Sequence, residues 1–377
     1  MKIFTLSELE ELNLIQLGRG KVISKNDLKN NPGTYPVYSS AKKRDGVFGT
    51  WSNFDFNEEM ITWSVDGGGD LFYRSKHKFS VTNVGGFIRI TDKNKILTKY
   101  LFYALKNLHN TVDFDWVKKA HPSVLRKEYN YIPVPSLQEQ EKIVEKLDKV
   151  YISKEKLSKK CSQASRLYAD LKNSVLKQTF EKLLIGNKIS LLGEITTVAS
   201  GGTPKKSNVE YWNGGIDWLS SGELENLYLD SSVKQISKLG LENSSAKIFP
   251  EGSLLVGMYD TAAFKMSIIN FPMAFNQAIC GITPDDKIDI LFIYYQLQFL
   301  KNKILKQRVG VRQQNLNISK MRNIEVIIPD LKIQKVISKN IYEQFSYIDE
   351  LSNINSNKNP KLQELMKSAL RKEFSYE

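Results

Sequence analysis

The chain has little of the chemistry by which common enzyme and metal-binding classes are identified. It contains two cysteines, Cys161 and Cys280, which are too few and too unpatterned for a disulfide framework or a zinc site, and which fit a reducing cytoplasm. The three histidines, His77, His109 and His121, do not have the spacing of metal ligands. We therefore expect a cytoplasmic location and no metal bound by this chain.

Motifs for nucleotide binding and methyl transfer are absent as well. No GxxxxGK[ST] string occurs, which argues against a P-loop ATPase. The glycine cluster DGGGD at 66–70 lacks the strand, helix and distal acid of a dinucleotide site, so a turn is expected there. The string nearest to an adenine-methyltransferase signature, NPGTY at 31–35, lacks the second proline. We predict a chain that is not an enzyme and binds no cofactor of its own.

Long apolar runs are also missing, since no segment approaches the roughly 18 to 20 residues that span a bilayer. The opening MKIFTLSELEEL does not resemble a secretory signal and predicts a short helix capped by Thr5 with Glu8 three residues on. What the chain has in excess is positive charge: 54 Lys and Arg against 41 Asp and Glu give +13 at pH 7. This favours a polyanionic partner, with nucleic acid as the leading candidate and a generally basic proteome as the alternative.

An internal repeat organises the sequence. At a constant offset of 194 residues, PSLQEQEKIVEKL (135–147) aligns with PDLKIQKVISKNI (329–341), and LKNSVLKQTF (171–180) aligns with LMKSALRKEF (365–374). Chance similarity does not keep one register across two segments this far apart. The segments before each anchor diverge more, so we predict two copies of a variable block followed by a helix.

The helix of the first copy is predicted to be long and one-sided. From Ile143 to Val175 its apolar residues recur alternately every four and three positions, with one interruption. A continuous helix from about Gln138 to Leu183 would be roughly 65–70 Å long, and Gly186 would end it. In the second copy the apolar series fails at Asn355, and Pro360 cannot donate an amide hydrogen bond, so a kink is expected.

A helix of this length needs a partner, and we predict that the two copies pair in antiparallel orientation; an ordinary amphipathic core helix is the alternative. Each variable block has the pattern of a mixed α/β fold. Strands are predicted at EMITWSV (59–65), GGFIRI (85–90), SLLVGMY (253–259) and AICGIT (278–283), and helices at 97–108 and 288–305.

Basic, hydroxyl and amide side chains gather in loops of both blocks and suit contact with phosphates and base edges. Residues 301–322 hold seven Lys or Arg and no acidic residue; a solvated basic helix end is the alternative interpretation. Trp212 and Trp218, beside one such loop, are expected to belong to the core. The candidate DNA-binding residues are Ser39, Lys42, Lys43, Arg44, Arg74, Lys118, Lys119, Thr203, Lys205, Lys206, Arg308, Arg312, Gln313 and Gln314.

These segments resemble the specificity subunits of type I restriction-modification systems over essentially the whole chain. YIPVPSLQEQEKIVEKLD (131–148) is similar to that family's junction between a target-recognition domain and its spacer helix. SGGTPKKSNVEYWNGGIDWLSSGEL, from residue 200, is similar to a common second recognition domain, and GTYPVYSSAKKRDGVFG (33–49) to a common first one.

The resemblance implies an α+β fold: two mixed α/β target-recognition domains joined by two long antiparallel helices and related by a pseudo-twofold repeat. The predicted division is 1–136, first recognition domain; 137–186, central helix; 187–330, second recognition domain; and 331–377, C-terminal helix, kinked near 353–360. Residues expected to serve helix pairing or subunit docking are Leu137, Gln140, Ile143, Leu147, Leu157, Leu171, Leu331, Gln334, Ile337, Ile341 and Leu365.

The implied function is recognition of a bipartite site in double-stranded DNA, one domain for each half-site. Two methyltransferase subunits would dock on the helices and supply S-adenosylmethionine chemistry, and a restriction subunit would add ATP- and Mg-dependent translocation and cleavage. The second junction departs from the family pattern, because Ile333 and Lys335 replace the acidic residues Glu139 and Glu141 of the first. The alternatives are the recognition portion of a fused type II-like methyltransferase-nuclease and a protein-binding coiled-coil adaptor.

Overall fold

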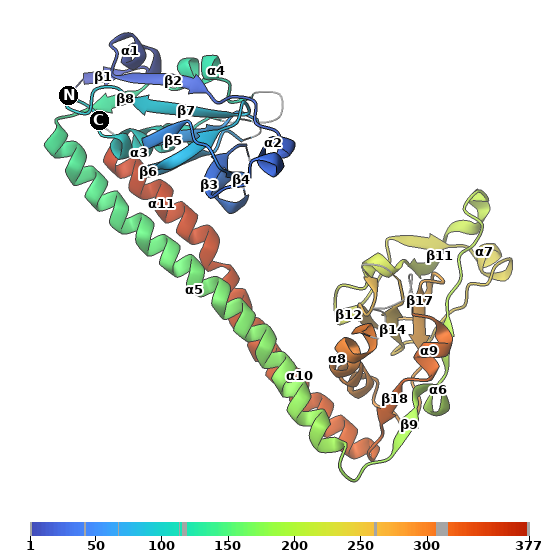
Figure 1. Cartoon of the computed structure of the whole chain (residues 1–377). Helices are drawn as coiled ribbons and strands as arrows, with labels where there is room; N and C mark the ends of the chain where they lie inside the picture. The colour runs from blue at the N-terminus through green and yellow to red at the C-terminus, as the bar shows by residue number, and fades with distance from the viewer. Residues whose placement is uncertain are drawn as a thin grey trace. The chain divides into compact units, whose positions relative to one another are not determined.

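The computed structural model describes residues 2–40, 43–66, 68–112, 114, 119–259, 262–306 and 316–374 (Figure 1). The chain forms two compact units, the first from Met1–Ser162 with Ser356–Glu377 and the second from Gln163–Asn355. Each unit thus combines one variable block with the beginning of the long helix that follows it and the end of the long helix of the other copy.

The block of the first unit is a six-stranded sheet with the strand order β2-β7-β5-β6-β3-β4, antiparallel except where β3 meets β6. Helix α3 packs against β5 and β6 and buries Tyr100, Leu101 and Leu105 in the core. The elements are β1 (Lys2–Phe4), α1 (Leu6–Glu11), β2 (Ile15–Arg19), α2 (Lys25–Asn30), β3 (Tyr35–Tyr38), η1 (Lys43–Gly46), β4 (Val47–Trp51), β5 (Phe56–Ser64), β6 (Leu71–Val81), β7 (Gly85–Ile90), α3 (Thr98–His109), α4 (Pro122–Glu128) and β8 (Ile132–Val134).

The block of the second unit has a five-stranded sheet, β10-β17-β14-β15-β12, and a three-stranded sheet, β13-β11-β16. Helix α8 contributes Phe292, Ile293 and Leu297 to the core. The elements are β9 (Ile189–Leu191), α6 (Leu192–Ile195), β10 (Val198–Ser200), η2 (Val209–Tyr211), β11 (Trp212–Leu219), η3 (Ser221–Glu223), β12 (Tyr228–Leu229), β13 (Lys234–Ile236), α7 (Lys238–Glu242), β14 (Leu254–Gly257), β15 (Met266–Ile269), β16 (Ala274–Phe275), β17 (Ile279–Ile282), α8 (Ile290–Lys306), α9 (Ile318–Arg322) and β18 (Glu325–Ile327).

The long helices have the bounds that the sequence indicates. Helix α5 runs from Leu137 to Leu183 without a break, α10 spans Leu331–Ser356 and α11 spans Lys358–Phe374. Gly186 has φ +84°, a conformation that glycine adopts without steric cost, and the Asn187 side chain donates to the Leu183 carbonyl at 2.9 Å, so the predicted stop is confirmed. The second arm is interrupted at Asn357, which places Pro360 in the first turn of α11, where no amide donor is needed.

The long helices pair within each unit in antiparallel orientation, as predicted. In the first unit Lys146 of α5 forms an ion pair of 3.3 Å with Glu373 of α11. In the second, Lys172 of α5 reaches Asp349 of α10 at 2.6 Å. The apolar series ends at Asn355, as predicted, yet this polar side chain is buried and donates to Ser165 at 3.1 Å. A buried polar side chain at a helix seam, such as Asn355, fixes the register of paired helices at some cost in stability.

The repeat detected in sequence extends through the fold. The first strand of each block pairs antiparallel with the strand that precedes its long helix, β1 with β8 and β9 with β18. A capping acid opens the short helix after each first strand: Glu8 accepts from the Thr5 amide, as the sequence predicts, and Glu194 accepts from the Leu191 amide. The two copies therefore close their blocks in the same way.

The matching positions of the two phenylalanines at the ends of the repeated helices have a structural reason. Phe180, at the end of the first copy's helix, is buried in the second unit, with ring centroids 5.5 Å from both Phe292 and Phe299 of α8. Phe374, at the end of the second copy's helix, is buried in the first unit, 5.6 Å from Tyr100 of α3. Each helix end is thus a core element of the block encoded by the other copy.

Candidate nucleic-acid interface and helix junctions

The loop between β3 and β4 is held by a buried arginine. Arg74 of β6 donates from Nη1 to Asp45 Oδ2 at 3.0 Å and from Nη2 to the Asp45 carbonyl at 2.8 Å, while its Nε donates to Thr62 Oγ1 at 2.9 Å. Its guanidinium lies 3.6 Å from the centroid of the Tyr38 ring. The side chain is 2% exposed. Although Arg74 was predicted to contact DNA, its side chain is buried and each of its three nitrogens donates to the protein, so we assign it to holding this loop.

Surrounding groups fix the arginine in turn. Burial lowers the pKa of the Arg74 guanidinium, while the nearby Tyr38 and Asp45 act in the opposite direction. The Tyr38 hydroxyl lies 2.9 Å from His77 Nε2. Ser39, another predicted contact, is half-buried; its amide donates to the Gly46 carbonyl and its hydroxyl accepts from Thr82. The loop backbone is therefore held by hydrogen bonds at Ser39, near its start, and at Asp45, near its end, without a bound ligand.

The corresponding basic loop of the second unit presents two exposed lysines on a rigid base. Gly202 donates its amide to the Phe275 carbonyl at 2.9 Å and accepts the indole hydrogen of Trp218 at 2.9 Å. Trp218 is buried, as predicted, whereas Trp212 is half-buried and donates to the Lys205 carbonyl at 3.4 Å. Lys205 and Lys206 are exposed, and neither forms an ion pair with another residue in the part of the chain that the structure describes. Their charges are therefore available to phosphates.

The other predicted DNA-binding residues are placed as follows. The Thr203 hydroxyl donates to Gln277 at 2.5 Å, and Lys119 forms an ion pair of 3.0 Å with Asp66. Lys43 and Arg44 belong to η1, but their side chains are not among those described. Lys42, Lys118, Arg308, Arg312, Gln313 and Gln314 lie outside the described residues.

Two lysines that the sequence did not single out lie against aromatic rings of the first unit. Lys21 is 4.8 Å from the Trp51 ring centroid and 2.5 Å from Asp55, and Lys78 is 4.7 Å from that of Phe54. Aromatic faces beside cations are common in nucleic-acid interfaces. The alternation of basic residues along β6, at Arg74, Lys76 and Lys78, could have identified Lys78. Nothing local in the sequence indicates that Lys21 meets Trp51.

A buried glutamine clamps each junction between block and long helix. In the first copy Gln140 accepts from the Leu97 amide at 2.9 Å and donates to the carbonyls of Lys95 at 2.8 Å and Pro135 at 3.0 Å. It is fully buried. Because Leu97 is the residue before α3, this one side chain joins the start of α3 to the start of α5.

The second copy repeats the clamp atom for atom. Gln334 accepts from the Asp289 amide at 2.9 Å and donates to the carbonyls of Lys287 at 3.1 Å and Pro329 at 2.8 Å. It too is fully buried. Asp289 caps α8 by accepting from the Phe292 amide, so the clamp again joins a block helix to a long helix. The junction motif shared by the two copies is therefore the sequence signature of this hydrogen-bond network.

The remaining residues predicted for pairing or docking divide by exposure. Ile143, Leu147 and Ile341 are buried, and Leu137, Leu331 and Ile337 are half-buried. Leu157, Leu171 and Leu365 are exposed. Exposure does not rise steadily along the series, because Cys161, which lies between Leu157 and Leu171, is buried.

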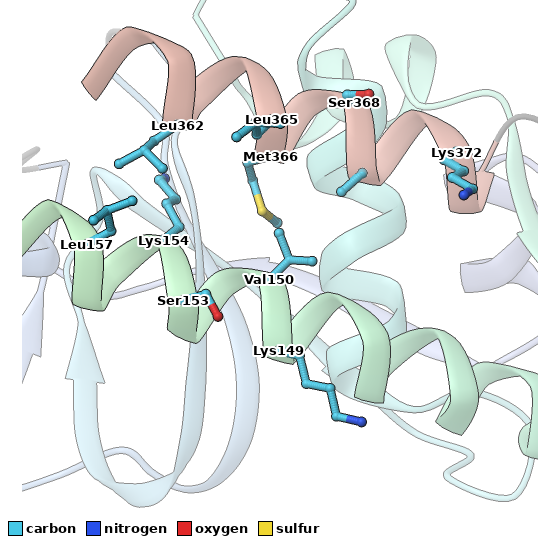
Figure 2. Close-up of a pocket in the computed structure, with 11 residues that line it drawn as sticks. Lys149, Val150, Ser153, Lys154, Leu157, Leu362, Leu365, Met366, Ser368 and Lys372 are labelled. Carbon is cyan, nitrogen blue, oxygen red and sulfur yellow. The ribbon is translucent and has the colours of Figure 1, made fainter. Parts of the chain in front are cut away.

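Some of the exposed residues line an apolar groove in the first unit. The groove has a volume of about 530 Å³ and lies between α5 and α11. Figure 2 shows Val150 and Met366 pointing toward each other across it, while Lys149 and Lys372 extend outward. Its lining is completed by Ser153, Lys154, Leu157, Leu362, Leu365, Ser368 and Ala369. Apolar surface between two helices with a basic rim is suited to a partner segment that is apolar and acidic.

In the part of the chain that the structure describes, no three His, Cys, Asp or Glu side chains are grouped so as to hold a metal ion. None of the helices there is long and apolar enough to cross a bilayer.

Comparisons with known proteins agree on one family. The model of the type I restriction modification DNA specificity domain matches residues 1–164 and 185–364. The EcoR124I/EcoR124II specificity subunit of Escherichia coli is 26% identical over 277 residues, covering 70% of this chain and 66% of that protein. A putative specificity subunit of Mycoplasma pneumoniae, S.MpnORF507P, is 28% identical over 342 residues, covering 88% of this chain and 86% of that one.

Coverage of other relatives is shorter, and solved structures extend the comparison. Two further putative type I specificity subunits of Mycoplasma pneumoniae, S.MpnORF285P and the S.MpnORF289P N-terminus, are 38% and 42% identical over 96 residues, which span 31% and 50% of their lengths. A chain from a study of complex assembly in a type I R-M system has a TM-score of 0.71 at 14% identity, covering 96% of this chain and 97% of that one. The HsdS subunit of Thermoanaerobacter tengcongensis has a TM-score of 0.53 at 14% identity, covering 96% of both. At these identities the structural likeness shows the fold: two α/β blocks joined by long helices.

Proposed function

Because the chain belongs to the family of type I restriction modification DNA specificity domains, we propose that it is the subunit that selects the DNA sequence, with one variable block reading each half of a bipartite duplex site. The observation that carries this proposal is the duplicated junction. Gln140 and Gln334 attach two unlike blocks to like helices by the same three hydrogen bonds, so the frame is repeated while the blocks differ.

The chemistry of the reaction is proposed to lie on partners. Two methyltransferase subunits would dock on the helical regions and carry S-adenosylmethionine, and restriction subunits would carry ATP and Mg. The groove between α5 and α11 offers apolar surface for such a contact. The two docking surfaces are expected to differ, because exposed Glu139 and Glu141 at the first junction correspond to exposed Ile333 and Lys335 at the second.

Duplex binding by the isolated chain should depend steeply on salt. If six phosphates are contacted, raising the salt from 50 to 200 mM should weaken binding of a random duplex about 10³-fold, because bound counterions are released from the DNA. Replacing Lys205 and Lys206 by alanine should reduce the slope of log affinity against log salt by about two. Replacing the exposed Lys159 and Lys160 of α5 should leave that slope unchanged. Binding without any salt dependence would contradict DNA recognition and favour the protein-binding adaptor.

Methyl transfer should require a second protein. With S-adenosylmethionine and DNA, the purified chain is expected to transfer no labelled methyl group, and adding the methyltransferase subunit should produce methylation at one bipartite motif. Exchanging residues 188–330 for those of a relative should change only one half of that motif. Methylation by the chain alone would contradict a non-catalytic role, and a change in both halves would contradict the assignment of one block to each half-site.

A further inference from the structure

The β3–β4 loop of the first unit contains an acidic side chain where phosphate binding alone would favour none. Asp45 lies directly after Lys43 and Arg44, and its side chain is 76% exposed. Its backbone has φ +55° and that of Gly46 has φ +82°. Non-glycine residues are uncommon in this left-handed region, and such strained positions gather at functional sites.

Hydrogen bonds from Arg74 fix the position of the Asp45 carboxylate. Arg74 holds both the Asp45 carbonyl and Oδ2, and Arg74 is itself fixed by Thr62 and stacked on Tyr38. One carboxylate oxygen is therefore bonded to a buried guanidinium, while most of the side chain stays open to solvent. A functional group fixed in this way loses little conformational entropy when it meets a ligand.

A carboxylate facing DNA is repelled by phosphates and by the acceptor atoms of base edges. In the major groove it can be satisfied only by an exocyclic amino group, cytosine N4 or adenine N6. The buried positive charge of Arg74 lowers the electrostatic cost of bringing a carboxylate to a polyanion. Arg74 does not reach bases itself, because its side chain is 2% exposed and each of its three nitrogens donates to the protein.

We propose that Asp45 is a specificity-determining residue of the first recognition block, accepting a hydrogen bond from a base amino group in the major groove, and that Arg74 positions it. This rests on the proposed function of the chain in DNA recognition. A loop that only contacted phosphates would bind them better without the negative charge of Asp45. A role in reading a base amino group accounts for an acidic side chain at this position.

The test is a methylation-motif measurement with the full chain and its methyltransferase partner on a randomised DNA library, read by sequencing. Asp45→Asn keeps the size of the side chain and tolerates the positive φ, and Asp45→Ala removes the acceptor. Both are expected to relax the preference at one base pair of one half-site about tenfold or more, while the other half-site keeps its preference. The base pair at which the preference is relaxed shows whether cytosine N4 or adenine N6 is the donor.

Arg74→Lys should relax the same base pair by a smaller factor, because lysine keeps the charge but not the two parallel bonds. The matched control is Glu11→Gln, an exposed acid of the same unit outside the loop, which should leave the motif unchanged. The salt slope of binding should not fall in the Asp45 variants, in contrast to loss of a phosphate contact. An unchanged motif in both Asp45 variants, or equal weakening at every position, overturns the assignment, whereas a wild-type complex without any sequence preference overturns the proposed function itself.

Discussion

Replacing Gln140 by alanine is expected to destabilise the first unit by about 3 kcal/mol, because a buried amide hydrogen and two buried carbonyls lose their partner together. The lost bonds are those to Leu97, Lys95 and Pro135. The amide of Leu97 should exchange with solvent about 100-fold faster, which native-state hydrogen exchange of the full chain can measure peptide by peptide. Exchange in the second unit should not change.

Matched variants make this result specific. Gln334→Ala should produce the corresponding effect in the second unit, with faster exchange of the Asp289 amide and unchanged amide exchange in the first unit. Gln140→Glu keeps the shape but, as a carboxylate, has no donor for the carbonyls of Lys95 and Pro135, so it should also destabilise at neutral pH. Lys159→Ala, on the exposed surface of α5, is the control. If Gln140→Ala and Lys159→Ala changed amide exchange in the first unit equally, the Gln140 clamp would not stabilise the junction more than an ordinary surface residue does.

Local patterns predicted much of the fold. Alternating and helical periodicity placed GGFIRI in strand β7 and the long helix at nearly its observed bounds. Each of these elements buries one face, so apolar residues recur along the sequence with the period of the strand or helix. The capped helix after Thr5 was predicted for the same reason: the donor and acceptor are three residues apart. The offset of 194 residues then gave the arrangement of two blocks and two helices.

Contacts between distant residues could not be predicted. Gln140 was singled out from the repeat, but two of its three partners, Leu97 and Lys95, lie more than 40 residues away in a loop with no signature of its own. Arg74 was predicted to contact DNA, yet its side chain is buried and donates to Asp45, which lies 29 residues away in the sequence. Asn355 interrupted the apolar pattern, but its burial against Ser165 depends on pairing with α5. In each case the deciding bond joins elements that only the fold brings together.

The length of α5 should set the spacing of the DNA target. Four residues inserted after Ser158, matched by four at Asn357 between α10 and α11, add about 6 Å of helix to each arm. If the helices set the distance between the two DNA-reading blocks, the preferred number of base pairs between the half-sites should change by about two, at roughly 3.4 Å per base pair. The half-site sequences themselves should stay the same, because neither block is altered.

Methylation sequencing of the complex on a library with variable spacers measures this directly. The paired insertion is used because a single one would shift α5 against its partners and break contacts such as that of Lys146 with Glu373. A control insertion of four residues after Asn243, an exposed position of the second block, should leave the preferred spacing unchanged. Retention of the original spacing by a stably folded paired variant would show that the helices connect the blocks without measuring the distance between half-sites.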